Sequence, residues 1–184
     1  MEKATFDQYL ELGQMIKRGE LDRQTVQALI EGRMAARSGE TSYTITLDRS
    51  MSLGDMIAAG KYDSVNGHIT EKKFPIERQE GKSEVEVILV HFDKVLTTTQ
   101  VKSEFERRGL QPAKIENLLA LGTAHPDLQR DFPIAALGSA LQPSGGDLDS
   151  PYLGGDGDER DLDLDWYNPD VEWDGYWRFL AVRK

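Results

Sequence analysis

Four aspartates near the end of the chain lie close enough in sequence for their carboxylates to converge on a divalent cation. They are Asp156, Asp158, Asp161 and Asp163. Calcium takes several oxygen ligands from carboxylates and carbonyls, which suits this composition. The spacing differs from an EF-hand loop, which needs Asp-x-Asp/Asn-x-Asp/Asn-Gly and a later glutamate. Three interpretations stay open: a bound calcium ion, a solvated acidic face, or electrostatic attraction of a basic partner.

Aromatic side chains follow these acids and offer a second kind of chemistry. Tryptophan and tyrosine give a large contact area that can stack on a sugar or anchor a peptide, and they can equally fill a core. We expect Trp166 and Phe179 to point inward. The rings expected to be exposed on a loop surface are Tyr167, Trp173 and Tyr176. With the polar residues between them, the predicted ligand-binding residues are Tyr167, Asn168, Asp170, Trp173, Asp174 and Tyr176.

Motifs for covalent or cofactor chemistry are missing from the sequence. The absence of cysteine excludes disulfides, cysteine nucleophiles, thiolate zinc sites and iron–sulfur clusters. His68, His91 and His125 show no metal-ligand spacing, and there is no Gly-x-Ser-x-Gly, Walker or dinucleotide-binding motif. We therefore predict no cofactor other than calcium. A metal-dependent hydrolase that uses the Asp156–Asp165 carboxylates is the enzymatic alternative.

The composition is that of a globular protein with acidic character. Of the 184 residues, 39% are hydrophobic and 29% are charged, which predicts one domain, with or without an appendage. No apolar run is long enough to span a bilayer, and the start does not resemble a secretory leader, so we expect a cytoplasmic location. A net charge of −10 disfavours nucleic-acid binding, which needs a cationic face.

The N-terminal region differs from the rest of the chain in its pattern. Apolar residues at helical spacing in 5–16 and 23–34 predict a helical hairpin. The small, polar stretch Ala35–Glu40 then reads as a linker. We predict a hairpin appendage over 1–40 and a main domain over 41–184. The hairpin either packs on the main domain or forms a homo-oligomer or partner contact through residues 5–34.

The main domain is predicted to mix strands and helices. Apolar patterns predict strands at 43–47, 84–92, 134–137, 161–166 and 178–182. Helices are predicted from caps and stops at Ser52 to Gly60, Thr98 to Gly109, Pro112 to Gly122, and 127–132. Glycine, serine, proline and aspartate after Gly138 indicate surface loops. This order favours an α+β domain.

Two of these strands would hold the candidate site. Alternation in 161–166 would place Leu162, Leu164 and Trp166 toward the core and the aspartates toward water. The run 178–182 is apolar on both parities after its first residue, so we expect a strand that is covered on both sides and closes a sheet.

The segments Gly109–Leu119 and Trp177–Arg183 resemble the Pro-to-Glu helix entry and the closing aromatic-Arg strand of one fold. This is the C-type-lectin-like fold of formylglycine-generating enzymes, of diversity-generating-retroelement variable proteins and of uncharacterised bacterial relatives. The resemblance implies a rigid frame whose loops, Gly145 to Tyr176, face a ligand. Oxidase activity in that family uses paired cysteines, which this chain lacks. Asn168-Pro169-Asp170 and Trp173-Asp174-Gly175 are similar to the calcium-lectin triplets, each with a departure.

These observations together predict a non-enzymatic module that binds a protein or a small molecule. Its site would be the acidic, aromatic loop surface within 145–176, with no nucleic-acid or membrane partner. The alternative is the divalent-metal-dependent hydrolase, and a third class is an assembly protein that oligomerises through its hairpin.

Overall fold

Apart from residue 18, the described residues belong to the second of two units of the chain. This computed structural model describes residues 18, 39–139 and 148–184. The chain divides between Ser38 and Gly39, and the second unit is Gly39–Lys184. The predicted hairpin and its 5–34 contact surface lie outside the described residues, as does 145–147 of the predicted loop surface.

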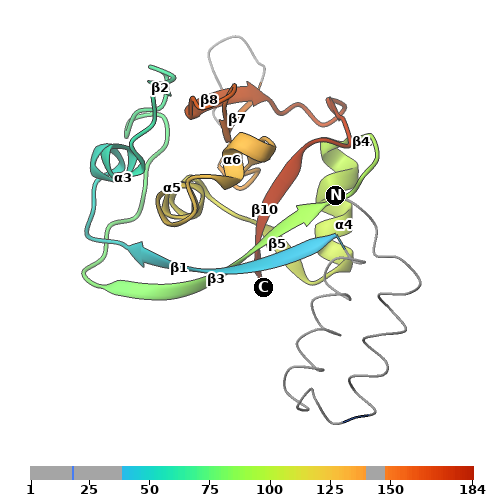
Figure 1. Cartoon of the computed structure of the whole chain (residues 1–184), viewed down its shortest axis with the longest axis horizontal. Coiled ribbons are helices and arrows are strands. Elements are labelled where there is room, and N and C mark those ends of the chain that lie inside the picture. Colours follow the sequence, from blue (N-terminus) through green and yellow to red (C-terminus); the bar gives the residue numbers. More distant parts are fainter. Residues whose placement is uncertain (1–17, 19–38, 140–147) are drawn as a thin grey trace. The chain divides into compact units, whose positions relative to one another are not determined.

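A mixed sheet frames this unit and curves from β1 and β3 at the bottom of Figure 1 to β7 and β8 at its top. In the described part, its strands lie in the order β1-β3-β10-β6-β7-β8-β2, and β5 also pairs with β10. The β10–β6 and β2–β8 pairs are parallel, and the others are antiparallel. A separate two-stranded ladder joins β4 to β9. The strands are β1 (Glu40–Asp48), β2 (Ser64–Val65), β3 (Lys82–His91), β4 (Leu96–Thr97), β5 (Leu110–Pro112), β6 (Ile134–Ala135), β7 (Asp149–Gly154), β8 (Asp161–Trp166), β9 (Glu172–Trp173) and β10 (Arg178–Arg183).

The helices begin at side-chain caps that the sequence largely predicts. Ser52 accepts a hydrogen bond from Asp55 N, as predicted for an N-cap. The second cap is Thr97, one residue before the predicted Thr98. In the described residues the helices are α3 (Leu53–Gly60), α4 (Thr98–Arg107), α5 (Ile115–Ala124) and α6 (Leu128–Asp131). None of them has the length and apolar character needed to cross a bilayer.

The prediction of a helix from Pro112 to Gly122 is wrong at both ends. Pro112 ends β5, where it lies opposite Ala181, and α5 begins only at Ile115. At the other end, the helix continues through Gly122 to Ala124. Gly122 is there for close packing, because a Cβ at this position would overlap the Tyr62 hydroxyl and Leu153.

Hydrophobic side chains pack on both faces of the sheet. On one face, Val87 and Leu180 belong to a core cluster with residues of α3 and α5. On the other face, Ile88 and Phe179 pack with residues of α4. The predicted double coverage of 178–182 and the inward position of Phe179 are therefore confirmed, since residues of β10 are packed in both clusters. The unit combines helices with a mixed sheet, as an α+β domain does.

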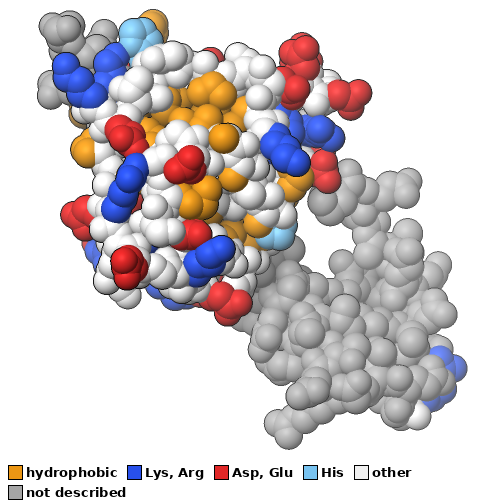
Figure 2. Space-filling view, turned by 90° about the vertical axis from the view of Figure 1, so that its left-hand side faces the viewer, with side chains coloured by type: hydrophobic (Ala, Val, Ile, Leu, Met, Phe, Trp, Pro, Cys, Tyr) orange, Lys and Arg blue, Asp and Glu red, His pale blue; other side chains and the backbone are white. Residues whose placement is uncertain are grey.

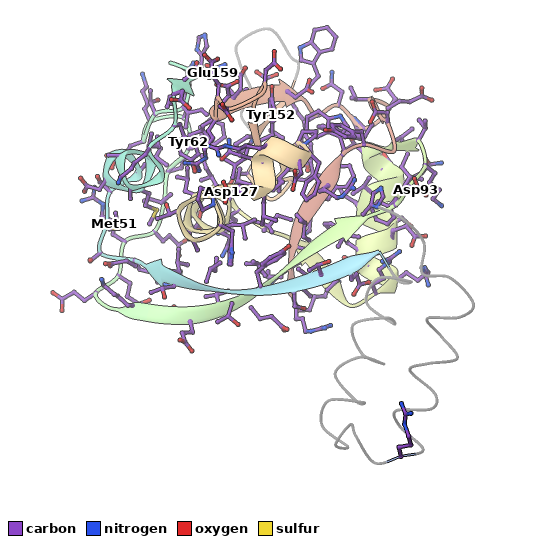
Figure 3. The ribbon with its side chains drawn as sticks, viewed as in Figure 1. Met51, Tyr62, Asp93, Asp127, Tyr152 and Glu159 are labelled. Atoms are coloured by element: carbon purple, nitrogen blue, oxygen red, sulfur yellow. The ribbon has the colours of Figure 1, made fainter. Side chains whose placement is uncertain are left out.

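A buried arginine joins the ends of two helices to the start of β8. Arg160 is 6% exposed, and its guanidinium donates to Gly60 O at the end of α3 (2.6 Å), Gly122 O in α5 (2.7 Å) and Gln129 Oε1 (3.0 Å). It also lies over the ring of Tyr62, 5.0 Å from the centroid. Figure 3 shows Tyr62 on the inner side of α3. The partial negative charge at a helix C-terminus favours a cation, so both helix ends stabilise Arg160.

Candidate functional site

The β7–β8 hairpin positions the predicted acidic residues. In its antiparallel register, Tyr152 lies opposite Asp163. Side chains alternate along a strand, so Asp161, Asp163 and Asp165 project from the same face as Tyr152. All three carboxylates are half-buried. We call Asp161, Asp163 and Asp165 the acidic strip.

Negative charge on the acidic strip is not neutralised by a described cation. No Lys or Arg in 39–139 or 148–184 makes an ion pair with any of its three carboxylates. Asn66 Nδ2 donates to Asp163 Oδ1 at 2.6 Å, which orients that side chain without supplying charge. Burial, followed by the charges of Asp163 and Asp149, raises the pKa of Asp165. Burial and the three strip carboxylates likewise raise the pKa of Tyr152.

Trp166 lies at the end of the acidic strip and is exposed. The prediction that it points into the core is wrong, because 67% of the residue is accessible to solvent. The reason lies in what covers that face of β8: the core cluster of the described residues includes Leu162 and, partly buried, Leu164, but does not extend to Trp166. An exposed indole therefore stands next to Asp165, whose Oδ1 accepts from the Trp166 main-chain N (2.7 Å).

Two of the rings predicted to be exposed are instead buried. Tyr167 is 5% exposed and donates its hydroxyl to Leu137 O. Trp173 is 2% exposed, and its Nε1 donates to Thr98 Oγ1 at 2.9 Å. The β4–β9 ladder holds Trp173 against Phe179 and Trp177, which is a long-range pairing that the local pattern does not reveal. Both rings stabilise the frame from within.

The other predicted ligand-binding residues lie at the surface or near it. Tyr176 is 58% exposed, as predicted, and its hydroxyl donates to Asp131 O (2.6 Å). Asp174 and Asp170 are exposed, and Asp174 accepts from Tyr176 N. Asn168 accepts from Leu148 N at 3.0 Å, which joins the start of β7 to the loop after β8. A ligand-binding role for these residues stays a prediction.

The four predicted metal ligands are divided between two elements. Asp161 and Asp163 belong to β8, whereas Asp156 and Asp158 are exposed in the turn that precedes it. Among the described residues, no group of three or more His, Asp or Glu side chains is arranged to hold a metal ion. Calcium binding stays a prediction.

A pocket that the sequence analysis missed lies beside β1. It has a volume of about 230 Å³ and is walled by β1, α3 and α5, with Thr44, Thr46, Met51, Met56, Leu119 and Ala120 among its lining residues. Figure 2 shows the face of the molecule that carries α3, where hydrophobic side chains gather within a border of charged ones. Small residues at 59, 120 and 124 leave this space open. These alanines are the feature of the sequence from which the pocket could have been predicted.

Comparisons with known proteins name no relative of this chain. No protein-family model, curated protein or solved structure matches it. Function is therefore inferred from the geometry of the acidic strip and of the pocket beside β1.

Proposed function

We propose that the protein is a non-enzymatic binding module whose acidic strip and Trp166 bind a cationic ligand, either a protein segment or a small molecule. The observation that carries this proposal is the row of three half-buried carboxylates without a described counter-ion. Partly desolvated like charges repel one another, and a bound cation relieves that repulsion. Binding therefore gains more here than at an isolated surface carboxylate.

The exposed ring of Trp166 adds a contact that favours guanidinium or ammonium groups. A cation over an indole face is attracted by the ring's quadrupole, by about 0.5–1 kcal/mol at an exposed site. Trp166 follows Asp165 in β8, and consecutive side chains of a strand point to opposite faces, so the indole would bind a second cationic group of the ligand at the end of the acidic strip. A short arginine-containing peptide is the simplest ligand with this chemistry.

The test is calorimetric titration of the full chain with tetra-arginine at low salt. Replacing all three strip residues by asparagine (D161N/D163N/D165N) is expected to weaken binding by about tenfold or more. The matched control, D156N/D158N/E159Q, removes the same formal charge from the exposed turn before β8 and is expected to change the affinity by less than about twofold. Equal losses in the two variants would mean that only net charge attracts the peptide, and the proposal would be wrong.

The metal-dependent hydrolase remains the alternative function, and thermal melting of the same proteins separates it. A bound ion stabilises the folded chain by mass action. If calcium or magnesium raises the melting temperature of the wild type but not of D161N/D163N/D165N, the strip is a metal site rather than a receptor for cationic groups. Metal analysis of protein purified without chelators gives the matching occupancy.

The finer structural predictions belong to the same proposal. They are the C-type-lectin-like identity of the domain, the helical hairpin over 1–40 with a homo-oligomeric contact, and the cytoplasmic location. An experimental structure of the full chain whose strand connectivity differed from C-type lectin domains would remove the first of these.

A further inference from the structure

The outer edge of β1 offers main-chain groups in a regular row. His91 N donates to Gly39 O and Arg49 N donates to Gly81 O, which places hydrogen-bonded pairs at both ends of the β1–β3 ladder. Such pairs alternate along an antiparallel ladder, so the odd-numbered residues of β1 bond to β3. Ser42, Thr44 and Thr46 therefore direct their N–H and C=O groups away from the sheet.

No described strand or side chain bonds to these outward groups. Edge strands usually carry a lysine, a proline or a bulge that prevents another strand from pairing with them. β1 reads Glu-Thr-Ser-Tyr-Thr-Ile-Thr-Leu-Asp, without lysine or proline, and its register with β3 is continuous over all nine residues. As far as the described residues are concerned, the strand is thus open to pairing along its length.

The pocket beside β1 lies directly along this edge. Thr44 and Thr46 line it together with Met51 and Leu119. Its volume of about 230 Å³ exceeds the roughly 150 Å³ of an engineered cavity that accommodates benzene, so a large aliphatic or aromatic side chain fits. Methionine side chains adapt to different shapes, which suits a pocket that receives a side chain from outside.

We propose that the β1 edge and this pocket bind an extended segment of another protein by strand addition. Main-chain hydrogen bonds to Ser42, Thr44 and Thr46 hold the segment, and one of its apolar side chains fills the pocket. Alternate side chains of an added strand point to the same face, so the segment is expected to carry apolar residues at every second position. This site is separate from the acidic strip, since β1 and β8 lie toward opposite ends of the sheet order.

Charge indicates that the bound segment is basic. Residues 1–38 contain six acidic and six basic residues, so the net charge of −10 lies within 39–184. Next to the edge, exposed Glu84 lies opposite Thr46 and makes no ion pair with a described residue. Lysine or arginine at the positions that flank the apolar side chains would complement this charge.

The experiment begins with selection of random ten-residue displayed peptides on the full chain. Enrichment of peptides with apolar residues at alternate positions and basic neighbours is expected. The best peptide, labelled and measured by fluorescence anisotropy, then provides the probe. In amide exchange followed by NMR, the Ser42, Thr44 and Thr46 amides are expected to exchange quickly in the free chain and slowly with the peptide bound.

Variants at the edge and in the pocket test the two contacts separately. Thr44→Pro removes one outward N–H while leaving the bonds to β3 in place, and is expected to weaken peptide binding by about tenfold or more. Thr44→Val keeps the N–H and is the matched control, with a change of less than about twofold. Ala120→Leu fills the pocket from a helix that tolerates leucine, and is expected to weaken binding to a similar degree as Thr44→Pro.

Three results would overturn this proposal. The first is a selection that enriches no alternating apolar sequence. The second is an enriched peptide that binds wild type, Thr44→Pro and Ala120→Leu equally. The third is a concentration-dependent dimer, abolished by Thr44→Pro, that shows no peptide binding; the occupant of the edge would then be a second copy of the chain. The tetra-arginine titration of the strip variant does not enter the peptide selection, the binding assays of the edge and pocket variants, or the dimer measurement. The two proposals can therefore fail independently.

Discussion

Replacing Arg160 by methionine tests whether the buried guanidinium holds α3, α5 and β8 together. Methionine has a similar length and an apolar end, so the change removes the donors with little loss of volume. The side chain makes three hydrogen bonds, of 2.6, 2.7 and 3.0 Å, to two main-chain carbonyls and one amide oxygen. Without them, the Gly60 and Gly122 carbonyls lose a charged partner at helix ends that are already packed in the interior.

The expected magnitude follows from opposing effects. Hydrogen bonds to a charged group contribute about 1.5–3 kcal/mol each, and leaving a buried acceptor unsatisfied costs about 1–3 kcal/mol. Methionine avoids the cost of burying a cation, which is several kcal/mol. The difference predicts that Arg160→Met lowers the free energy of unfolding by about 3 kcal/mol, equivalent to a fall in melting temperature of roughly 6–12 °C for a chain of this size.

Urea unfolding followed by tryptophan fluorescence measures this change, because Trp173 is buried in the fold and becomes exposed on unfolding. Arg78→Met is the control: that side chain is 53% exposed and forms a surface ion pair with Glu71, so a change within about 0.5 kcal/mol is expected. Arg160→Lys keeps the charge but cannot reach three acceptors, and should give an intermediate loss. Wild-type stability for Arg160→Met would refute the reasoning, because the network would then contribute nothing net.

Three further predictions concern single side chains. Tyr62→Phe removes a buried hydroxyl without a described partner, so it is expected to raise the free energy of unfolding by up to about 1 kcal/mol. The new methyl group of Gly122→Ala would overlap that hydroxyl, so Tyr62→Phe should also recover part of the stability that Gly122→Ala loses. A double-mutant cycle of urea unfolding measures this coupling. Trp173→Ala should cost about 3–5 kcal/mol in the same assay, whereas Trp166→Ala should change stability by less than about 0.5 kcal/mol, and equal effects would contradict their assigned burial. Because the pKa of Asp165 is raised in the folded state, its ionisation opposes folding as pH rises above the unfolded pKa of 3.8. Asp165→Asn should therefore stabilise the chain near pH 7 and lose that advantage below about pH 4. Melting temperatures of both proteins measured against pH test this prediction.

The strands with a clear local pattern could be predicted from the sequence, and those defined by distant partners could not. Alternation identified β1 and β8, and the continuous apolar run identified β10, because each pattern records which faces are covered. β7 was missed, since it contains Pro151 and ends at Gly154 within a stretch typical of loops. Its strand character comes from pairing with β6 and β8 on its two sides.

The prediction of which candidate aromatic residues are buried failed for the same reason. Trp173 is sealed by Leu96, its partner in the β4–β9 ladder, which lies far upstream in the chain. Trp166 is exposed because the core cluster on its face of β8 ends at Leu164 among the described residues. The residues near each tryptophan in the sequence do not reveal these contacts. The periodicity of 161–166 therefore identified a strand correctly but predicted the wrong environment for its last side chain. Asp161, Asp163 and Asp165 share one face as alternation predicts, but they are half-buried rather than turned fully to water, and Asp156 and Asp158 lie outside the strand.

Arg160 also explains how two separate candidate surfaces can share one rigid frame. It immediately precedes Asp161, the first residue of the acidic strip. Its guanidinium contacts the last residue of α3 and Gly122 of α5, and these two helices form walls of the pocket beside β1. A buried cation at this junction makes a small shift of either helix costly, because a shift would lengthen bonds that cannot be replaced by water. Rigid walls lower the entropy lost when a peptide side chain enters the pocket, which is the condition that strand addition needs to reach useful affinity.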